Sequence, residues 1–212
     1  MTGAKGDDMQ IAAPITELAR LGGVRRYGRK TMLIREGEPG AALFVLLEGR
    51  VRIFAEGHDG RRFVFGAYGP GTLFGEGSLD GGPRTASVES MSECACAVVP
   101  YADLRQRMAG DPLFAMTLLT ELIMRSRAST LRIKSLALDS VYERLRALIE
   151  AEAVEHNGIR ALSPDCSQQE IANRLGSSRD MVTKIFRELA KGGYIETGRG
   201  GTRILRALPK AW

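Results

Sequence analysis

The stretch Ser167–Leu189, SQQEIANRLGSSRDMVTKIFREL, decides the fold, because it contains two short amphipathic helices joined at a glycine. In the first helix Ser167 is expected to accept the third helical N–H while Glu170 reaches back to the cap. Gly176 supplies the left-handed residue that ends this helix. Ser177 or Ser178 caps the second. The spacing puts the apolar side chains on one face of each helix: Ile171, Ala172 and Leu175 in the first, and Val182, Ile185, Phe186 and Leu189 in the second. The pattern predicts a helix-turn-helix.

Polar side chains occupy the other face of the second helix. Arg179, Asp180 and Thr183 fall in its first turns, the part that meets base edges when such a helix enters the major groove. Arginine pairs there with guanine, and aspartate accepts from cytosine. Lys191, at the end of this helix, is expected to meet phosphate. The alternative is an ordinary helical hairpin with solvated charges.

The residues after these helices predict a wing. Tyr194–Thr197 and Thr202–Leu205 have the composition of strands, and the glycine turn between them carries Arg199 at its tip. From Ser163 to Trp212 there are nine Lys and Arg and five Asp and Glu, so this last quarter holds a net +4 of the chain's +5. Such an asymmetry suits binding to DNA phosphates, although a basic excess is also common on ordinary soluble surfaces.

Composition bounds the class of protein. The 212 residues suit two modest domains, and no run of eighteen apolar residues or secretory signal is seen, so a cytoplasmic protein is expected. Three cysteines without a C-x-x-C pair indicate reduced structural thiols rather than disulfides or a metal cage: Cys94, Cys96 and Cys166. The two histidines, His58 and His156, are interpreted as solvated turn residues rather than metal ligands.

Short apolar runs broken by glycines extend from about Tyr27 to Val99. They predict an antiparallel β structure, a small barrel or roll, with a short helix at Ile15–Leu21 before it and another at Tyr101–Met108 after it. The clearest predicted strands are Thr31–Ile34, Leu43–Leu47, Val51–Phe54, Arg62–Phe65, Thr85–Glu89 and Cys94–Val98.

A long helix is predicted to begin at Asp111-Pro112. It carries two apolar stripes, one of Met116, Leu119, Ile123, Thr130, Ile133 and Ala137 and the other of Leu118, Leu122, Ser129 and Leu136. Two stripes indicate two packing partners, the β domain and a second copy of the helix in a parallel dimer. The alternative is a helix packed once, against its own domain. Another helix is expected at Asp139–Val154, which places a hinge near Leu136–Asp139.

These predictions divide the chain into a β-roll domain (1–110), a dimerisation helix and hinge (111–138), and a winged helix-turn-helix domain (139–212). The fold class is α+β.

The loop Phe74–Val88, FGEGSLDGGPRTASV, lies between two predicted strands. It offers glycine backbone that a ligand can approach, the carboxylate of Glu76, the guanidinium of Arg84 and the hydroxyl of Thr85. These groups suit a nucleotide phosphate. The alternative is a surface loop with a salt bridge between Glu76 and Arg84.

Several motifs together resemble the bacterial CRP–FNR transcription regulators over nearly the whole chain. Ile34–Gly40 (IREGEPG) and Val45–Val51 (VLLEGRV) are similar to that family's β-roll signatures, and Tyr68–Glu76 (YGPGTLFGE) leads into its phosphate-binding cassette. A Gly-Glu followed by Pro-Arg-Thr-Ala is specific to cyclic-nucleotide-binding domains.

The resemblance implies roles for individual residues. Gly75 and Glu76 would hold a ribose 2′-hydroxyl, and Arg84 and Thr85 the cyclic phosphate. Ala128 and Ser129 would contact the base, with Ser129 reaching across a dimer. Arg179, Asp180 and Lys184 match the three base-reading positions of the recognition helix.

The chain also departs from the family pattern. The cassette is one residue shorter between Glu76 and Arg84, Gly77 replaces an aliphatic residue, and Ala128 lacks a base-reading hydroxyl. Asp180 and Lys184 stand where the best-known members carry Glu and Arg. The cysteine cluster and haem-ligand histidines of other sensor branches are missing.

The protein is expected to be a homodimeric, DNA-binding transcription regulator that works with RNA polymerase. A cyclic nucleotide is expected to control it, with cyclic AMP as the first candidate. It is not expected to be an enzyme, because no nucleophile–base pair or metal-ligand set can be assembled. Two alternatives remain: an effector-independent regulator with a closed pocket, and a cyclic-nucleotide-binding regulatory subunit of another protein.

Overall fold

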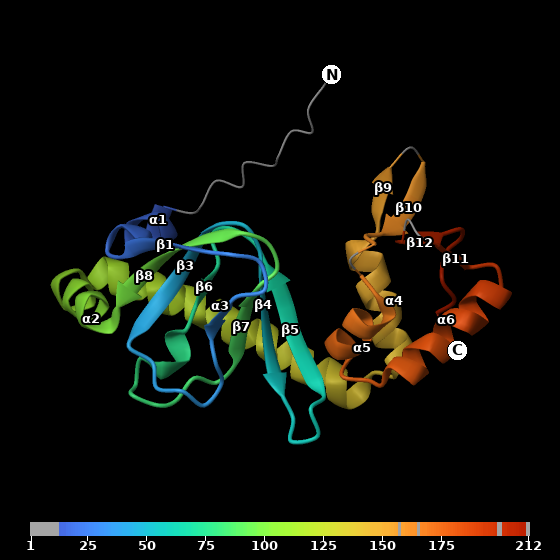
Figure 1. Ribbon diagram of the computed structural model, residues 1–212, viewed down its shortest axis with the longest axis horizontal. Coiled ribbons are helices and arrows are strands. Elements are labelled where there is room, and N and C mark those ends of the chain that lie inside the picture. The colour runs from blue at the N-terminus through green and yellow to red at the C-terminus, as the bar shows by residue number, and fades with distance from the viewer. Residues whose placement is uncertain (1–12, 157, 165, 199–200, 211–212) are drawn as a thin grey trace. The chain divides into compact units, whose positions relative to one another are not determined.

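The computed structural model describes residues 13–156, 158–164, 166–198 and 201–210, which form two compact units. Of these described residues, one unit comprises those in 13–55 and 65–125, and the other comprises those in 56–64 and 126–210. The described residues form both helices and antiparallel strands, which confirms the expected α+β class (Figure 1). None of the described helices combines the length and the apolar composition that a membrane span needs.

Two four-stranded sheets build the roll of the first unit. The first sheet has the order β1 (Gly23–Tyr27), β8 (Cys94–Pro100), β3 (Ala42–Glu48), β6 (Leu73–Phe74). The second has the order β2 (Met32–Ile34), β7 (Ser87–Ser90), β4 (Val51–Glu56), β5 (Arg62–Tyr68). Neighbours such as β3 and β8, or β4 and β7, pair antiparallel, so the predicted antiparallel roll is confirmed.

Three helices accompany the roll: α1 (Ala13–Arg20), α2 (Tyr101–Gly110) and the long α3 (Pro112–Leu138). Leu18 of α1, Leu104 of α2 and Leu118 of α3 are buried in one apolar cluster with side chains of β3 and β8. Figure 1 shows α1 and α2 at one end of the sheets. The first half of the Leu118 stripe, Leu118 and Leu122, therefore packs against the β domain as its sequence predicts, whereas Ser129 and Leu136 are exposed.

Besides the end of α3, the described part of the second unit contains three complete helices and a third sheet. The helices are α4 (Val141–Glu152), α5 (Gln168–Leu175) and α6 (Arg179–Lys191), and the sheet has the order β11 (Ile195–Gly198), β12 (Gly201–Ile204), β10 (Ile159–Leu162), β9 (Val154–His156). Their apolar faces share one buried cluster that includes Leu145, Ile149, Leu162, Ile171 and Phe186.

Some boundaries differ from the prediction. The helix α4 begins at Val141 rather than Asp139, because Ser140 caps it and Glu143 completes a reciprocal capping box. β7 begins at Ser87, so Thr85 precedes the strand instead of lying in it.

Candidate functional site

The helix-turn-helix is built by local capping, as its sequence predicts. Ser167 Oγ accepts the Glu170 N–H at 3.2 Å, and Ser178 Oγ accepts the Met181 N–H at 3.2 Å. Gly176 ends α5 with a φ of +62°, a left-handed conformation that glycine adopts without strain. The apolar faces predicted for the two helices are buried, which leaves the polar face of α6 for a partner.

Four predicted DNA contacts lie exposed on α6: Arg179, Asp180, Lys184 and Lys191. None of them has an ion-pair partner among the described residues. Arg179 and Asp180 occupy the first turn of the helix, where its N–H groups also point outward. Arg179 therefore presents a charge without an ion-pair partner at the end of the helix that a major groove admits, and Lys184 and Lys191 follow along the helix.

Thr183 has a different local role. Its hydroxyl donates to Gln168 Oε1 at 2.7 Å, and the residue is half-buried. This bond joins the start of α5 to the first turns of α6. The structure thus gives Thr183 a partner inside the motif, and its reading of a base edge stays a prediction.

A partly buried ion pair joins α5 to α4. Arg174 donates to both carboxylate oxygens of Glu152, one of them at 2.7 Å. Hydrogen bonding to Glu152 raises the pKa of the Arg174 guanidinium above its ordinary value. Arg144 also donates from Nε to the Leu175 carbonyl at 3.1 Å, which satisfies a carbonyl at the end of α5.

The predicted wing is a hairpin of β11 and β12, in which Glu196 pairs with Arg203 at 2.9 Å. Arg199, the predicted tip contact, lies outside the described residues.

The phosphate-cassette candidate has Arg84 at its centre. Its side chain is buried, with 8% of the residue exposed. Nη1 donates to the Gly75 carbonyl at 2.6 Å and to the Tyr101 hydroxyl at 2.9 Å, and Nη2 donates to the Ala42 carbonyl at 2.8 Å. The Tyr101 hydroxyl in turn donates to the same Gly75 carbonyl. Neutral groups therefore hold the guanidinium in place without cancelling its charge.

Glu76 pairs elsewhere. Its carboxylate lies 3.7 Å from Nη1 of Arg125, a residue of α3 that also donates to the Leu73 carbonyl at 2.5 Å. The salt bridge between Glu76 and Arg84 that the sequence left open as an alternative is not found among the ion pairs of the described residues.

Donor capacity remains in the cassette. A guanidinium has five N–H donors, so Nε–H and one N–H of Nη2 of Arg84 have no partner among the described residues. The Thr85 side chain also has no hydrogen bond there. A Cβ at Gly77 would lie 3.0 Å from Thr85 Oγ1, so glycine lets this hydroxyl approach the turn. These donors fit an oxyanion.

Gly75 has a φ of +88°, and a Cβ there would lie 2.7 Å from Nη1 of Arg84. Only glycine suits this close approach. Ala128 and Ser129, the predicted base contacts, are exposed on α3 in the second unit, so their approach to a ligand stays a prediction.

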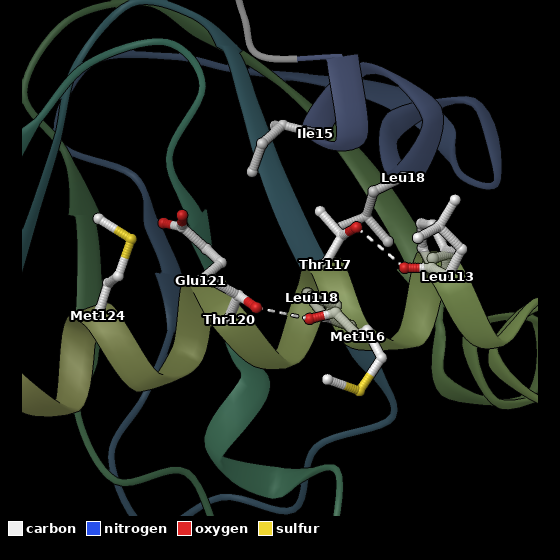
Figure 2. A pocket seen from close by; sticks show the side chains of 10 residues that line it. Ile15, Leu18, Leu113, Met116, Thr117, Leu118, Thr120, Glu121 and Met124 are labelled. Carbon is white, nitrogen blue, oxygen red and sulfur yellow. Dashed lines mark hydrogen bonds between the residues drawn. The ribbon is translucent and has the colours of Figure 1, made fainter.

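The proposed dimer stripe of α3 is exposed in the single chain. Met116, Leu119, Ile123 and Ile133 each expose more than two fifths of their surface, and Thr130 is exposed as well. Beside the stripe lies a hollow of about 420 Å³ between α1 and α3. Figure 2 shows Ile15 and Leu18 of α1 on one side of it and Leu113, Met116 and Met124 of α3 on the other.

Sequence reasoning missed Tyr101 and Arg125. Arg125 had a detectable signal, since it follows Leu118 and Leu122 at helical spacing, and a cation on that roll-facing stripe needs an acceptor. Tyr101 had none, because its bond to Arg84 joins residues 17 positions apart through the fold.

The three cysteines are free thiols. Burial raises the pKa of Cys96 to about 12, so this thiol stays protonated and unreactive. Within the described ranges no group of three or more His, Cys, Asp or Glu is placed to hold a metal ion.

Comparison with known proteins identifies two family models in the chain. Residues 24–111 match the cyclic nucleotide-binding domain, and residues 141–208 match the Crp-like helix-turn-helix domain.

Two curated relatives match this chain over most of its length and most of their own. The CRP-like cAMP-activated global transcriptional regulator of Mycobacterium tuberculosis is 31% identical over 174 residues, which are 80% of this chain and 78% of the relative. The cAMP-activated global transcriptional regulator Vfr of Pseudomonas aeruginosa is 30% identical over 191 residues, 85% of this chain and 88% of the relative.

Among solved structures, the c-di-GMP responsive global regulator CLP of Xanthomonas campestris matches with a TM-score of 0.79 and 26% identity. The match covers 93% of this chain and all of that one. A CRP/FNR family transcriptional regulator of Thermus thermophilus matches with a TM-score of 0.72 and 28% identity, over 87% of this chain and 94% of that one.

Proposed function

The chain belongs to the CRP–FNR family of DNA-binding transcription regulators, and on that premise we propose that a cyclic nucleotide bound in its β-roll controls its affinity for an operator. The observation that carries the proposal is the cassette, where a buried, positively charged Arg84 keeps free donors beside the Thr85 hydroxyl. The relatives compared above are named as regulators, so we place this chain with them as a non-enzymatic protein.

In this proposal Arg84 and Thr85 hold the cyclic phosphate. The Gly75 backbone and the Glu76 carboxylate hold the ribose 2′-hydroxyl, and Ala128 and Ser129 contact the base. Arg125 positions Glu76 from α3, because its guanidinium lies against that carboxylate. A ligand that engages Glu76 thereby acts on the same helix that carries the proposed dimer stripe.

Cyclic AMP is the proposed effector. The relatives' names give two effector chemistries, cyclic AMP and c-di-GMP. The first carries one phosphate and the second two. Of the guanidinium groups at the described cassette, Arg125 pairs with Glu76 and Arg105 donates to the Leu79 carbonyl, which leaves Arg84 as the proposed phosphate ligand. Calorimetry against cyclic AMP, cyclic GMP and c-di-GMP tests this choice, and binding of c-di-GMP alone would overturn it.

The effector-independent alternative requires a closed pocket. The pairing that would close it, Glu76 with Arg84, is replaced by Glu76 with Arg125. This favours an open anion site.

We propose a homodimer through the exposed stripe of α3, with the second copy covering Met116, Leu119, Ile123, Thr130 and Ile133. Apolar side chains exposed along several turns of one helix typically mark an interface. A two-fold dimer also presents two α6 helices to two half-sites. On the family resemblance we add RNA polymerase as a partner and the cytoplasm as the place of action.

The recognition role of α6 predicts different effects for two cations. Arg179→Ala is expected to cost about 1–3 kcal/mol at the operator and to relax base choice at one position per half-site, because an arginine in the first turn reads a base edge. Lys191→Ala, the matched control, is expected to weaken all sequences alike. Fluorescence anisotropy on operator and random DNA measures both; equal losses on the two DNAs for Arg179→Ala would refute base reading.

A further inference from the structure

The hydroxyl of Ser78 is a buried polar group without a partner. Ser78 exposes 1% of its surface, and its Oγ atom has no hydrogen bond among the described residues. The other buried serines of the roll are bonded: Ser87 Oγ accepts the Glu36 N–H at 3.0 Å, and Ser90 Oγ accepts the Thr31 N–H at 2.8 Å. A buried hydroxyl without a bond destabilises a fold, so this exception in the roll needs a reason.

Ser78 lies in the cassette, beside Arg84. It ends the 3-10 turn Glu76–Ser78, two residues after the proposed ribose ligand. A Cβ at Gly40 would lie 2.6 Å from Arg84 Cζ and 2.8 Å from Ser78 Cβ. The Ser78 Cβ and the Arg84 guanidinium therefore flank the same glycine, so the unbonded hydroxyl and the guanidinium belong to one small region of the cassette.

We propose that the Ser78 hydroxyl is a further ligand of the effector and donates a hydrogen bond to an oxygen of its phosphate. The inference rests on the proposed function, since it adds a contact to the same site. A hydroxyl gives an anionic oxygen a short, charge-assisted bond, and burial strengthens such a bond by excluding water. The ligand then satisfies the group that the free protein leaves unbonded.

The competing explanation is that Ser78 only fills space, so that alanine would serve as well. The two explanations predict different effects of Ser78→Ala on the binding of cyclic AMP. If Ser78 is a ligand, Ser78→Ala weakens the binding of cyclic AMP while leaving the melting temperature of the free protein unchanged or raising it, because the variant loses an unsatisfied hydroxyl. Ser87→Ala is the matched control, because it removes a serine whose hydroxyl is bonded. It is expected to lower the melting temperature and to have little direct effect on the binding of the cyclic AMP phosphate.

Calorimetry with cyclic AMP is the test. Ser78→Ala is expected to bind about tenfold more weakly, the effect of one hydrogen bond to a charged group. The two phosphorothioate analogues of cyclic AMP, in which sulfur replaces one or the other exocyclic oxygen, sharpen the test. Sulfur is a weak acceptor, so the wild type is expected to discriminate against one analogue, and Ser78→Ala is expected to lose that discrimination.

The outcomes separate this assignment from the proposed function. Equal affinities of the wild type and Ser78→Ala for cyclic AMP, with unchanged analogue preference, would overturn the Ser78 assignment alone. A wild type that binds none of cyclic AMP, cyclic GMP and c-di-GMP would overturn the proposed function and this assignment with it.

Discussion

Arg84→Leu is expected to weaken the binding of cyclic AMP by about a hundredfold or more, because removing one partner of a desolvated charge pair costs about 2–5 kcal/mol. The structure adds a second effect that the sequence did not predict. Arg84 donates to the carbonyls of Gly75 and Ala42 and to the Tyr101 hydroxyl. Their loss lowers the melting temperature by about 2–4 °C for each kcal/mol lost, so the variant should fold but be less stable.

Two control variants help to interpret this loss of affinity. Arg84→Lys keeps the charge without the bidentate geometry and should bind cyclic AMP with intermediate affinity. Arg105→Leu removes an exposed arginine that donates to the Leu79 carbonyl in the same loop, and it should leave affinity unchanged. Calorimetry and thermal melting measure all three variants. If Arg84→Leu binds cyclic AMP with the affinity of the wild type, Arg84 is not part of an anion site. That result would favour the effector-independent regulator.

Ile123→Asp is expected to dissociate the proposed dimer. Ile123 lies in the middle of the exposed α3 stripe, and a buried, unpaired carboxylate there costs several kcal/mol, about a hundredfold or more in the dimer constant. Operator affinity should fall with it, by about a hundredfold or more, because two half-sites are no longer bound by one tethered molecule.

The matched control is Met124→Asp. Met124 is exposed on the same helix, but it lies about 100° around the axis from Ile123, toward the hollow beside α1. This variant should remain dimeric by sedimentation velocity. An Ile123→Asp variant that sediments as a dimer would place the interface elsewhere on the chain.

The helix-turn-helix was predictable because the signals that build it are local. Ser167, Gly176 and Ser178 act within a few residues of their positions, and the helical period alone identifies the buried faces. The roll was predictable as a class, but β1 was missed. Its residues are mostly exposed along the whole strand, as on a sheet edge, so no alternation of apolar and polar side chains marks it.

The candidate site was predictable only in part, for the same physical reason. Gly75, Glu76, Arg84 and Thr85 lie in one loop, so their chemistry can be read together. The groups that position them come from distant segments: Ala42 from β3, Tyr101 from α2 and Arg125 from α3. Such contacts depend on the tertiary fold. The helical spacing of Arg125 indicates that its side chain needs an acceptor, but it does not identify Glu76 as that acceptor. Thr183 shows the converse, since its helical position suited a base contact while Gln168, fifteen residues away, binds its hydroxyl.

We expect the binding of a cyclic nucleotide in the roll and the binding of DNA on α6 to be coupled. The most direct test is a calorimetric titration of the wild-type protein with cyclic AMP, without DNA and with an operator selected from random sequences. The operator is expected to tighten cyclic AMP binding by about 5–150-fold, and cyclic AMP is expected to tighten operator binding by the same factor. The same affinity for cyclic AMP with and without the operator would contradict it.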